Sequence, residues 1–126
     1  MFSVVALKVL LVDDSEIIHA IVTAMFTDAG HAIVAAVSPE AVSPDALVGC
    51  DVVLVDLSFR HSALQTFFAR IRDEAPRSRV LLFSDKPDAI LEQTAVVLRA
   101  DGWVRKSTGA ALVDVVLSKV AHVSSS

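Results

Sequence analysis

Apolar residues along the chain alternate between two patterns, one typical of strands and one of helices. Five short runs are almost continuous in apolar, often β-branched residues. Strands that are buried on both faces of a parallel sheet have this pattern. The predicted strands span residues 7–12, 32–37, 51–55, 80–83 and 102–105.

The longer segments between these runs have the spacing of amphipathic helices. Ser15 is a candidate N-cap for the first helix, and Gly30 is placed to end it. The apolar face predicted for this helix carries Ile17, Ile21, Ala24 and Met25. The other predicted helices span residues 43–48, 63–75 and 87–99, and a last one, capped by Ser107 or Thr108, runs to residue 120.

The order of elements is therefore strand–helix repeated five times. Short links between alternating strands and helices predict an α/β fold, with a doubly wound, five-stranded parallel sheet between two helical layers. We expect residues 1–126 to form a single domain. Its core spans about 7–120, and 121–126 form a frayed tail.

Composition narrows the class of protein. Hydrophobic residues make up 54% of the 126 residues, which is enough for a core, and no uncharged stretch approaches the length of a membrane span. A net charge of −4 argues against nonspecific nucleic-acid binding. The single cysteine, Cys50, excludes an internal disulfide, and we expect it to be a small core residue. These features predict a cytoplasmic domain without direct nucleic-acid or membrane contacts.

Candidate chemistry lies where the predicted strands end. In parallel α/β sheets the ligand site lies at the carboxyl ends of the strands, and here Asp13, Asp14 and Asp56 follow the first and third runs. At a separation of ~4 Å each carboxylate pair would repel by about 4 kcal/mol, so a cation is needed. Carboxylate oxygens suit Mg²⁺, whereas the dispersed histidines have no zinc-site spacing.

Two more polar residues end the fourth and fifth runs. Lys106 could pair with Asp56 or with a phosphate on it, and the Ser84 hydroxyl could donate to a phosphate oxygen. Taken together with the three aspartates, these residues predict a phosphoryl-transfer site. One carboxylate would be the nucleophile, two would hold metal, and the lysine and the hydroxyl would stabilise charge.

Four segments, VLLVDDS, VVLVDLS, LLFS and GWVRK, resemble the signature segments of response-regulator receiver domains of two-component systems. The resemblance runs from Lys8 to Val120. It implies a flavodoxin-like three-layer sandwich. It also implies a phosphorelay signalling protein that promotes its own Mg²⁺-dependent phosphotransfer and dephosphorylation, rather than an enzyme with a separate substrate.

The resemblance also assigns roles to individual residues. Asp56 would be the phosphoacceptor, Lys106 would pair with the phosphate, and Ser84 and Trp103 would be switch residues. We expect Trp103 to be partly buried rather than freely moving. The Mg²⁺ ligands would be Asp13, Asp14, the Asp56 carboxylate and the backbone carbonyl of Ser58.

Two of the departures from the family pattern directly follow Ser84 and Lys106. Asp85 stands where a small residue usually follows the switch hydroxyl. It either points inward, where it would repel a phosphoryl group, or outward near a helix N-terminus. Ser107 replaces the proline that usually follows the lysine. A cis bond before a non-proline residue costs about 2.5–4 kcal/mol, so we expect the Lys106–Ser107 bond to be trans.

Three functions remain open. The first is a receiver standing alone, phosphorylated by a sensor histidine kinase or phosphotransfer protein. It would signal to a downstream protein through its fourth helix, fifth strand and fifth helix. A homodimer formed through the same face is also open. The second is a receiver-like interaction module that acts without phosphorylation. The third, a small phosphatase or flavodoxin-type protein, is weak because DDS is not a phosphate-cradling loop.

Overall fold

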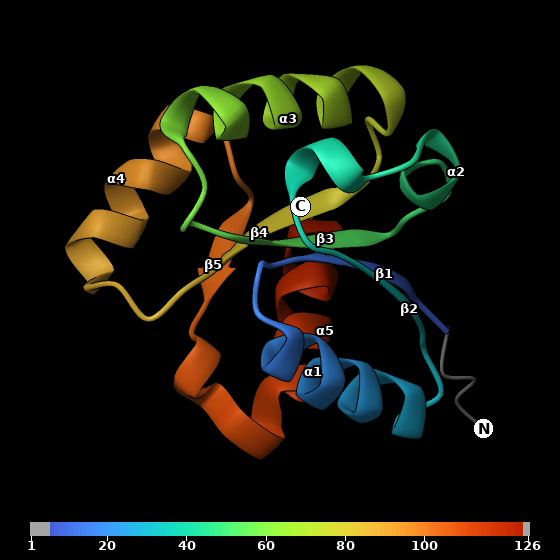
Figure 1. Cartoon of the computed structure of the whole chain (residues 1–126). Coiled ribbons are helices and arrows are strands. Elements are labelled where there is room, and N and C mark those ends of the chain that lie inside the picture. Colours follow the sequence, from blue (N-terminus) through green and yellow to red (C-terminus); the bar gives the residue numbers. More distant parts are fainter. Residues whose placement is uncertain (1–5, 125–126) are drawn as a thin grey trace.

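A single parallel sheet with strand order β2-β1-β3-β4-β5 runs through the described part of the molecule (Figure 1). The structure is a computed structural model, and it describes residues 6–124, with side chains to residue 121. The order reverses between β1 and β3, as in a doubly wound sheet. The strands are β1 (Lys8–Val12), β2 (Ala32–Ala36), β3 (Val52–Asp56), β4 (Arg79–Phe83) and β5 (Gly102–Val104).

Helices cover both faces of this sheet, which confirms the predicted fold class (Figure 1). One face carries α2 (Pro44–Leu47), α3 (His61–Glu74) and α4 (Asp88–Leu98). The other face carries α1 (Glu16–Asp28) and α5 (Leu112–Ser124). Two short 3₁₀ helices, η1 (Pro39–Ala41) and η2 (Lys106–Ala111), precede α2 and α5.

The core consists of two apolar layers because the central strands bury both of their faces. Every residue of β3 is buried, and its side chains alternate between the two layers. In α3, spacing alone identified the buried face correctly, and its members are Leu64, Phe67, Phe68 and Ile71. Cys50 is also buried, as expected, and its thiol donates to the carbonyl of Val52.

The face predicted for α1 is largely wrong, since only Met25 of its four residues packs against the core. Ile17 and Ile21 are 72% and 52% exposed, whereas Val22 and Phe26 are buried against the sheet. The helix carries apolar residues on nearly all sides, so its spacing admits more than one buried face. Packing of α1 onto the sheet selects the face on which the aromatic ring of Phe26 lies.

The start and end of the last helix also differ from the prediction. Ser107 and Thr108 do not cap it; they lie within η2, and α5 begins only at Leu112. Gly109 has φ 69° and ψ −137°, a backbone conformation that interrupts a continuous helix. The helix continues to Ser124, past the predicted end at 120, and residues 125–126 of the predicted tail lie outside the described residues.

Serine side chains cap the first two helices, and the N-cap predicted at Ser15 is confirmed. Ser15 accepts a hydrogen bond from the amide of Ile18, and Ser43 accepts one from Ala46.

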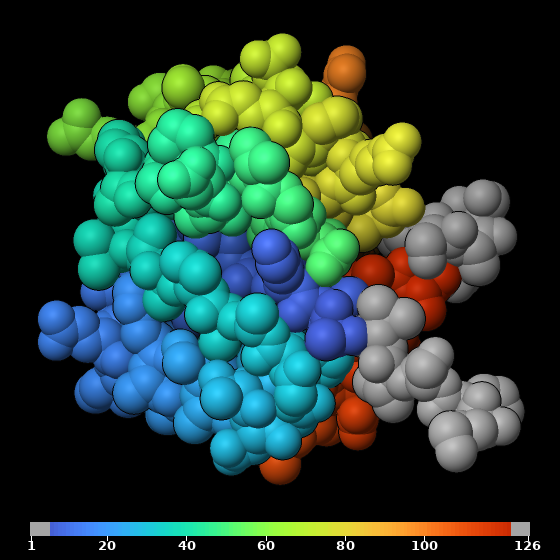
Figure 2. Space-filling view, turned by 90° about the vertical axis from the view of Figure 1, so that its right-hand side faces the viewer, coloured from blue at the N-terminus to red at the C-terminus, as the bar shows by residue number. Residues whose placement is uncertain are grey.

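Because α2 has only four residues, it leaves a hollow beside the edge strand β2, and dark blue residues of β1 are visible there in Figure 2. Among the described helices, none has the length and apolar character needed to cross a bilayer.

Candidate functional site

The carboxyl ends of β1 and β3 bring three carboxylates together. Val12 is in register with Val55 on the neighbouring strand, so Asp13 and Asp56 follow adjacent positions at one end of the sheet. Asp14 completes the cluster, and ligand oxygens of the three residues all lie within 4.8 Å of one another. The convergence predicted from the sequence is therefore confirmed.

Asp13 is fully buried, and its two carboxylate oxygens have different partners. Oδ1 accepts a hydrogen bond from the amide of Ser15, 2.8 Å away, which holds the carboxylate at the start of α1. Oδ2 lies 2.7 Å from the ammonium nitrogen of Lys106, its one polar partner among the described residues. Buried anionic oxygens with so few donors are receptive to a cation.

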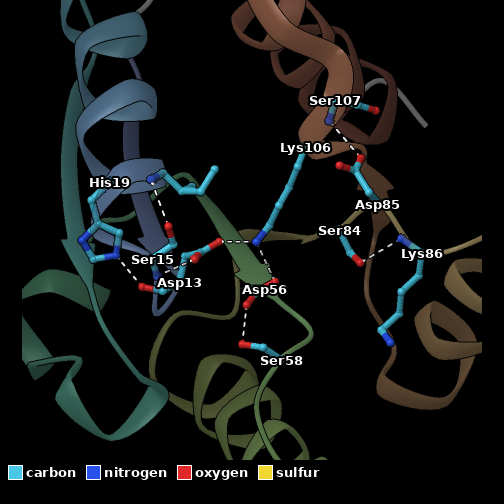
Figure 3. A network of polar contacts seen from close by, with 11 residues as sticks. Asp13, Ser15, His19, Asp56, Ser58, Ser84, Asp85, Lys86, Lys106 and Ser107 are labelled. Carbon is cyan, nitrogen blue, oxygen red and sulfur yellow. Dashed lines mark hydrogen bonds and ion pairs between the residues drawn. The ribbon is translucent and has the colours of Figure 1, made fainter.

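Lys106 pairs with Asp56 as well as with Asp13 (Figure 3). Its Nζ lies 2.9 Å from Oδ1 of Asp56, and the Ser58 hydroxyl donates to Oδ2 of the same carboxylate. The ammonium also lies 5.6 Å from the centre of the Phe83 ring, within cation–π range. The described site thus contains its own counter-ion between two of its acids.

The environment of Lys106 favours its charged form. Partial burial by itself lowers the pKa of the ammonium. Hydrogen bonds and charges from Asp13 and Asp56 outweigh this effect, so the pKa of Lys106 lies above its ordinary value of 10.5. The lysine is therefore a cation at neutral pH.

Ser84 and Asp85 follow β4 beside this cluster. Ser84 is buried, and its hydroxyl oxygen accepts a hydrogen bond from the amide of Lys86, 3.2 Å away. Asp85 points away from the acidic cluster, and its Oδ1 accepts from the amide of Ser107 at 2.9 Å (Figure 3). The inward orientation considered for Asp85 is therefore wrong. The Lys106–Ser107 bond is trans, as predicted.

Two contacts of the site could not be found from sequence. A ring nitrogen of His19 contacts the backbone carbonyl of Asp13, and only the path of α1 brings them together. The Ser58 hydroxyl donates a hydrogen bond to Asp56. The role of the Ser58 backbone carbonyl as a metal ligand stays a prediction. Trp103 is half-buried on β5, as expected, with the ammonium of Lys119 5.8 Å from its ring centre.

The donor set fits a small, hard cation. Three carboxylates supply oxygen atoms, one of them exposed to solvent at Asp14, so water can complete the coordination. Mg²⁺ prefers oxygen ligands and retains several waters. Within the described residues, this is the one group of acidic, histidine or cysteine side chains that is close enough to hold a metal ion.

Comparison with solved structures reveals close similarity in fold. The chemotaxis response regulator CheY4 of Vibrio cholerae has a TM-score of 0.76 and 23% identity, covering 92% of this chain and 99% of that one. A response regulator from Thermotoga maritima has a TM-score of 0.74 and 23% identity, covering 93% and 99%. The fold is that of response-regulator receiver domains.

A receiver domain from Clostridium thermocellum has the same fold at 18% identity, with a TM-score of 0.75 over 96% of this chain and 98% of that one. No protein-family model and no curated protein sequence matches the chain. The receiver fold is thus recognised through structure. The roles of its residues rest on the geometry of the acidic cluster and Lys106.

Proposed function

We propose that this chain is a signalling switch that accepts a phosphoryl group on Asp56. The main support is the position of the Asp56 carboxylate, at the end of a buried strand with Oδ1 2.9 Å from the Lys106 ammonium. A carboxylate held beside a fixed cation is a suitable nucleophile for phosphorus, because the cation stabilises charge on the phosphoryl oxygens. The donor would be a phosphohistidine on a sensor kinase or phosphotransfer protein.

The chemical step exchanges one bond for another. An oxygen of Asp56 forms a bond to phosphorus, the P–N bond to the donor imidazole breaks, and the nitrogen keeps the electron pair. Lys106 turns from Asp56 to the new phosphoryl oxygens. The Ser84 hydroxyl can donate to the same oxygens after its side chain rotates away from the amide of Lys86.

The acidic cluster would hold Mg²⁺ through Asp13, Asp14, Asp56 and the carbonyl of Ser58. When bound, the ion supplies positive charge that offsets the carboxylates and the incoming phosphoryl oxygens. Asp13 is the anchor, because its other oxygen is fixed by the Ser15 amide. We infer that the chain acts as a receiver and not as an enzyme on a separate substrate.

The output would be a changed surface for a downstream protein, formed by α4, β5 and α5. Ser84 and Lys106 precede α4 and α5, so their movement toward a phosphoryl group shifts both helices. On α4, Ile90, Val96 and Val97 are 44%, 74% and 61% exposed. Ile90 and Val97 are seven residues apart and share one side of α4, where they can contribute to a binding surface.

Phosphate uptake tests the proposal directly. The protein is incubated with Mg²⁺ and phosphoramidate, a small P–N donor, and its intact mass is measured. We expect one phosphate on the wild type and on Asp73→Asn, a control at an exposed position of α3, and none on Asp56→Asn. Chelation of Mg²⁺ should prevent the uptake.

The same samples address the alternative of a receiver-like module that acts without phosphate. An inward Asp85 would repel a phosphoryl group, but this residue points outward and bonds to the Ser107 amide. Trp103 is the single tryptophan and the chain has no tyrosine, so the protein's fluorescence reports on the surroundings of this one side chain. Absence of phosphate, and of any change in Trp103 emission on adding Mg²⁺ and beryllofluoride, would favour the alternative.

A further inference from the structure

The loops that follow β4 and β5 are connected beyond the end of the sheet. The two strands remain in register to Phe83 and Val104, and the amide of Ser84 then donates to the carbonyl of Val104 at 3.2 Å. After this point the chain diverges, into the loop before α4 on one side and into η2 on the other. Lys106 is the first residue of η2.

Asp85 connects the two diverging loops through hydrogen bonds. Its Oδ1 accepts from the Ser107 amide at 2.9 Å, and its carbonyl accepts from Nη1 of Arg105 at 3.3 Å. The two residues that flank Lys106 in the chain are therefore both bound to Asp85. Figure 3 shows the Asp85 carboxylate beside the Ser107 amide, while Lys106 extends in the other direction, toward Asp13 and Asp56.

The start of η2 needs such a partner. The first amides of a helix have no acceptor within it, and a side chain at the N-cap usually supplies one. The N-cap residue here is Arg105, which has no acceptor in its side chain and makes no capping hydrogen bond. Asp85 supplies the missing acceptor from a different loop, and its negative charge suits a helix N-terminus.

The position of this cap matters for Lys106 because a lysine side chain is long and freely rotating. Its ammonium reaches two carboxylate oxygens, at 2.7 and 2.9 Å, only if the backbone at residue 106 is well placed. Displacing a charge-stabilising group by about 1 Å can greatly reduce a rate. A free turn after β5 would allow such displacement.

We propose that Asp85 is a positioning residue for Lys106, holding the Ser107 amide so that the ammonium stays between Asp13 and Asp56. The inference rests on the proposed function for its effect on phosphoryl transfer. The hydrogen bond itself, and the placement of the lysine, are independent of it. Asp85 and Ser107, the two departures that follow Ser84 and Lys106, thus act as a pair.

Three variants separate this role from a simple change of charge. Asp85→Ala removes the acceptor, and Asp85→Asn keeps an oxygen that can accept from Ser107. Asp88→Ala removes an equal charge from the same region, but Asp88 pairs with Arg105 and not with Ser107. Hydrogen exchange of the Ser107 amide, followed by NMR on the metal-free protein, should be faster in Asp85→Ala alone.

The effect on Lys106 is measured through phosphorylation by phosphoramidate. Asp85→Ala should slow uptake about fivefold, the effect of one lost hydrogen bond. Asp88→Ala and Asp85→Asn should remain near the wild-type rate. Because Asp85 acts through the lysine, Asp85→Ala should have no further effect in a Lys106→Ala background.

If the wild type takes no phosphate, the proposed function fails, and Mg²⁺ binding followed by calorimetry then tests the positioning. A loosened ammonium competes less with the ion, so Asp85→Ala should bind Mg²⁺ about threefold more tightly than Asp88→Ala. The positioning role is overturned by unchanged Ser107 exchange in Asp85→Ala. It is also overturned if Asp85→Ala and Asp88→Ala have equal phosphorylation rates or, in a protein that takes no phosphate, equal Mg²⁺ affinities.

Discussion

The ammonium nitrogen of Lys106 lies 2.7 Å from Oδ2 of Asp13, a carboxylate with no exposure to solvent. The two residues come from opposite ends of the chain and meet only because the carboxyl ends of β1 and β5 lie at the same side of the sheet. Breaking a buried ion pair by removing one partner leaves the other charge uncompensated. Lys106 is therefore a structural residue as well as the proposed partner of the phosphoryl group.

Replacing Lys106 by methionine should destabilise the metal-free protein. The buried Asp13 then loses its counter-ion, and we expect the free energy of unfolding to fall by about 3 kcal/mol. Added Mg²⁺ should recover part of the loss, because a bound ion neutralises the same carboxylate. Urea unfolding with chelator and with Mg²⁺ measures both effects.

Lys86→Met is the matched control, since Lys86 is an exposed lysine in the loop before α4. It should change the free energy of unfolding by no more than about 0.5 kcal/mol in either condition. An equal loss in both lysine variants would contradict the special role of the Lys106–Asp13 pair.

Asp13→Asn should weaken Mg²⁺ binding about tenfold or more, as measured by calorimetry. The substitution keeps the shape of the side chain but removes the charge that the Ser15 amide fixes in place. Glu16→Gln, at an exposed position in the first turn of α1, provides a control of equal charge. If both variants bind Mg²⁺ equally well, the ion is attracted by the general field and not held by Asp13.

Cys50 should make the protein less stable at alkaline pH. Burial raises the pKa of this thiol from 9.0 to about 11. Above pH 9 the unfolded chain loses the thiol proton while the folded chain keeps it, so stability falls as pH rises through this window. The loss is about 2 kcal/mol at pH 11 and approaches about 3 kcal/mol above it.

Urea unfolding of wild type and Cys50→Ala across this pH range checks the effect. The alanine variant is less stable throughout because it creates a cavity, so the informative quantity is the slope with pH. The titration of Lys106 affects the unfolding free energy of both proteins equally, so it cancels when the two slopes are compared. Parallel curves would mean that the thiol titrates alike in the folded and the unfolded chain.

The two faces of α1 should respond very differently to substitution. Phe26→Ala empties a fully buried position and should lower the free energy of unfolding by about 3–5 kcal/mol. Ile17→Ser, at a position 72% exposed, should change it by no more than about 0.5 kcal/mol. A large loss on Ile17→Ser that depends on protein concentration would instead indicate that another copy of the chain covers this face.

Much of the site could be predicted because its residues directly follow strands. A buried parallel strand is a continuous apolar run, so the first polar residue after it is visible in the sequence. The carboxyl ends of all such strands lie at the same end of the sheet. The apolar runs therefore identify Asp13, Asp14, Asp56 and Ser84 from the sequence.

The face of α1 and the start of α5 depended on longer-range information. Apolar residues surround α1, and periodicity cannot select a buried face when several are equally apolar. After Gly109, α5 docks against the sheet through Leu112 and Val116, whereas serine and threonine at 107 and 108 have the local properties of N-caps.

The sequence by itself determined the order of strands and helices along the chain. It also determined the acidic residues of the cluster and the ability of Lys106 to pair with them, because strand burial and residue chemistry are local properties. Only the tertiary structure decided the direction of each side chain. Asp85 illustrates the difference: its charge and neighbours left two orientations open. The unsatisfied amide of Ser107, brought within 2.9 Å by the adjacent strand, selects the outward one.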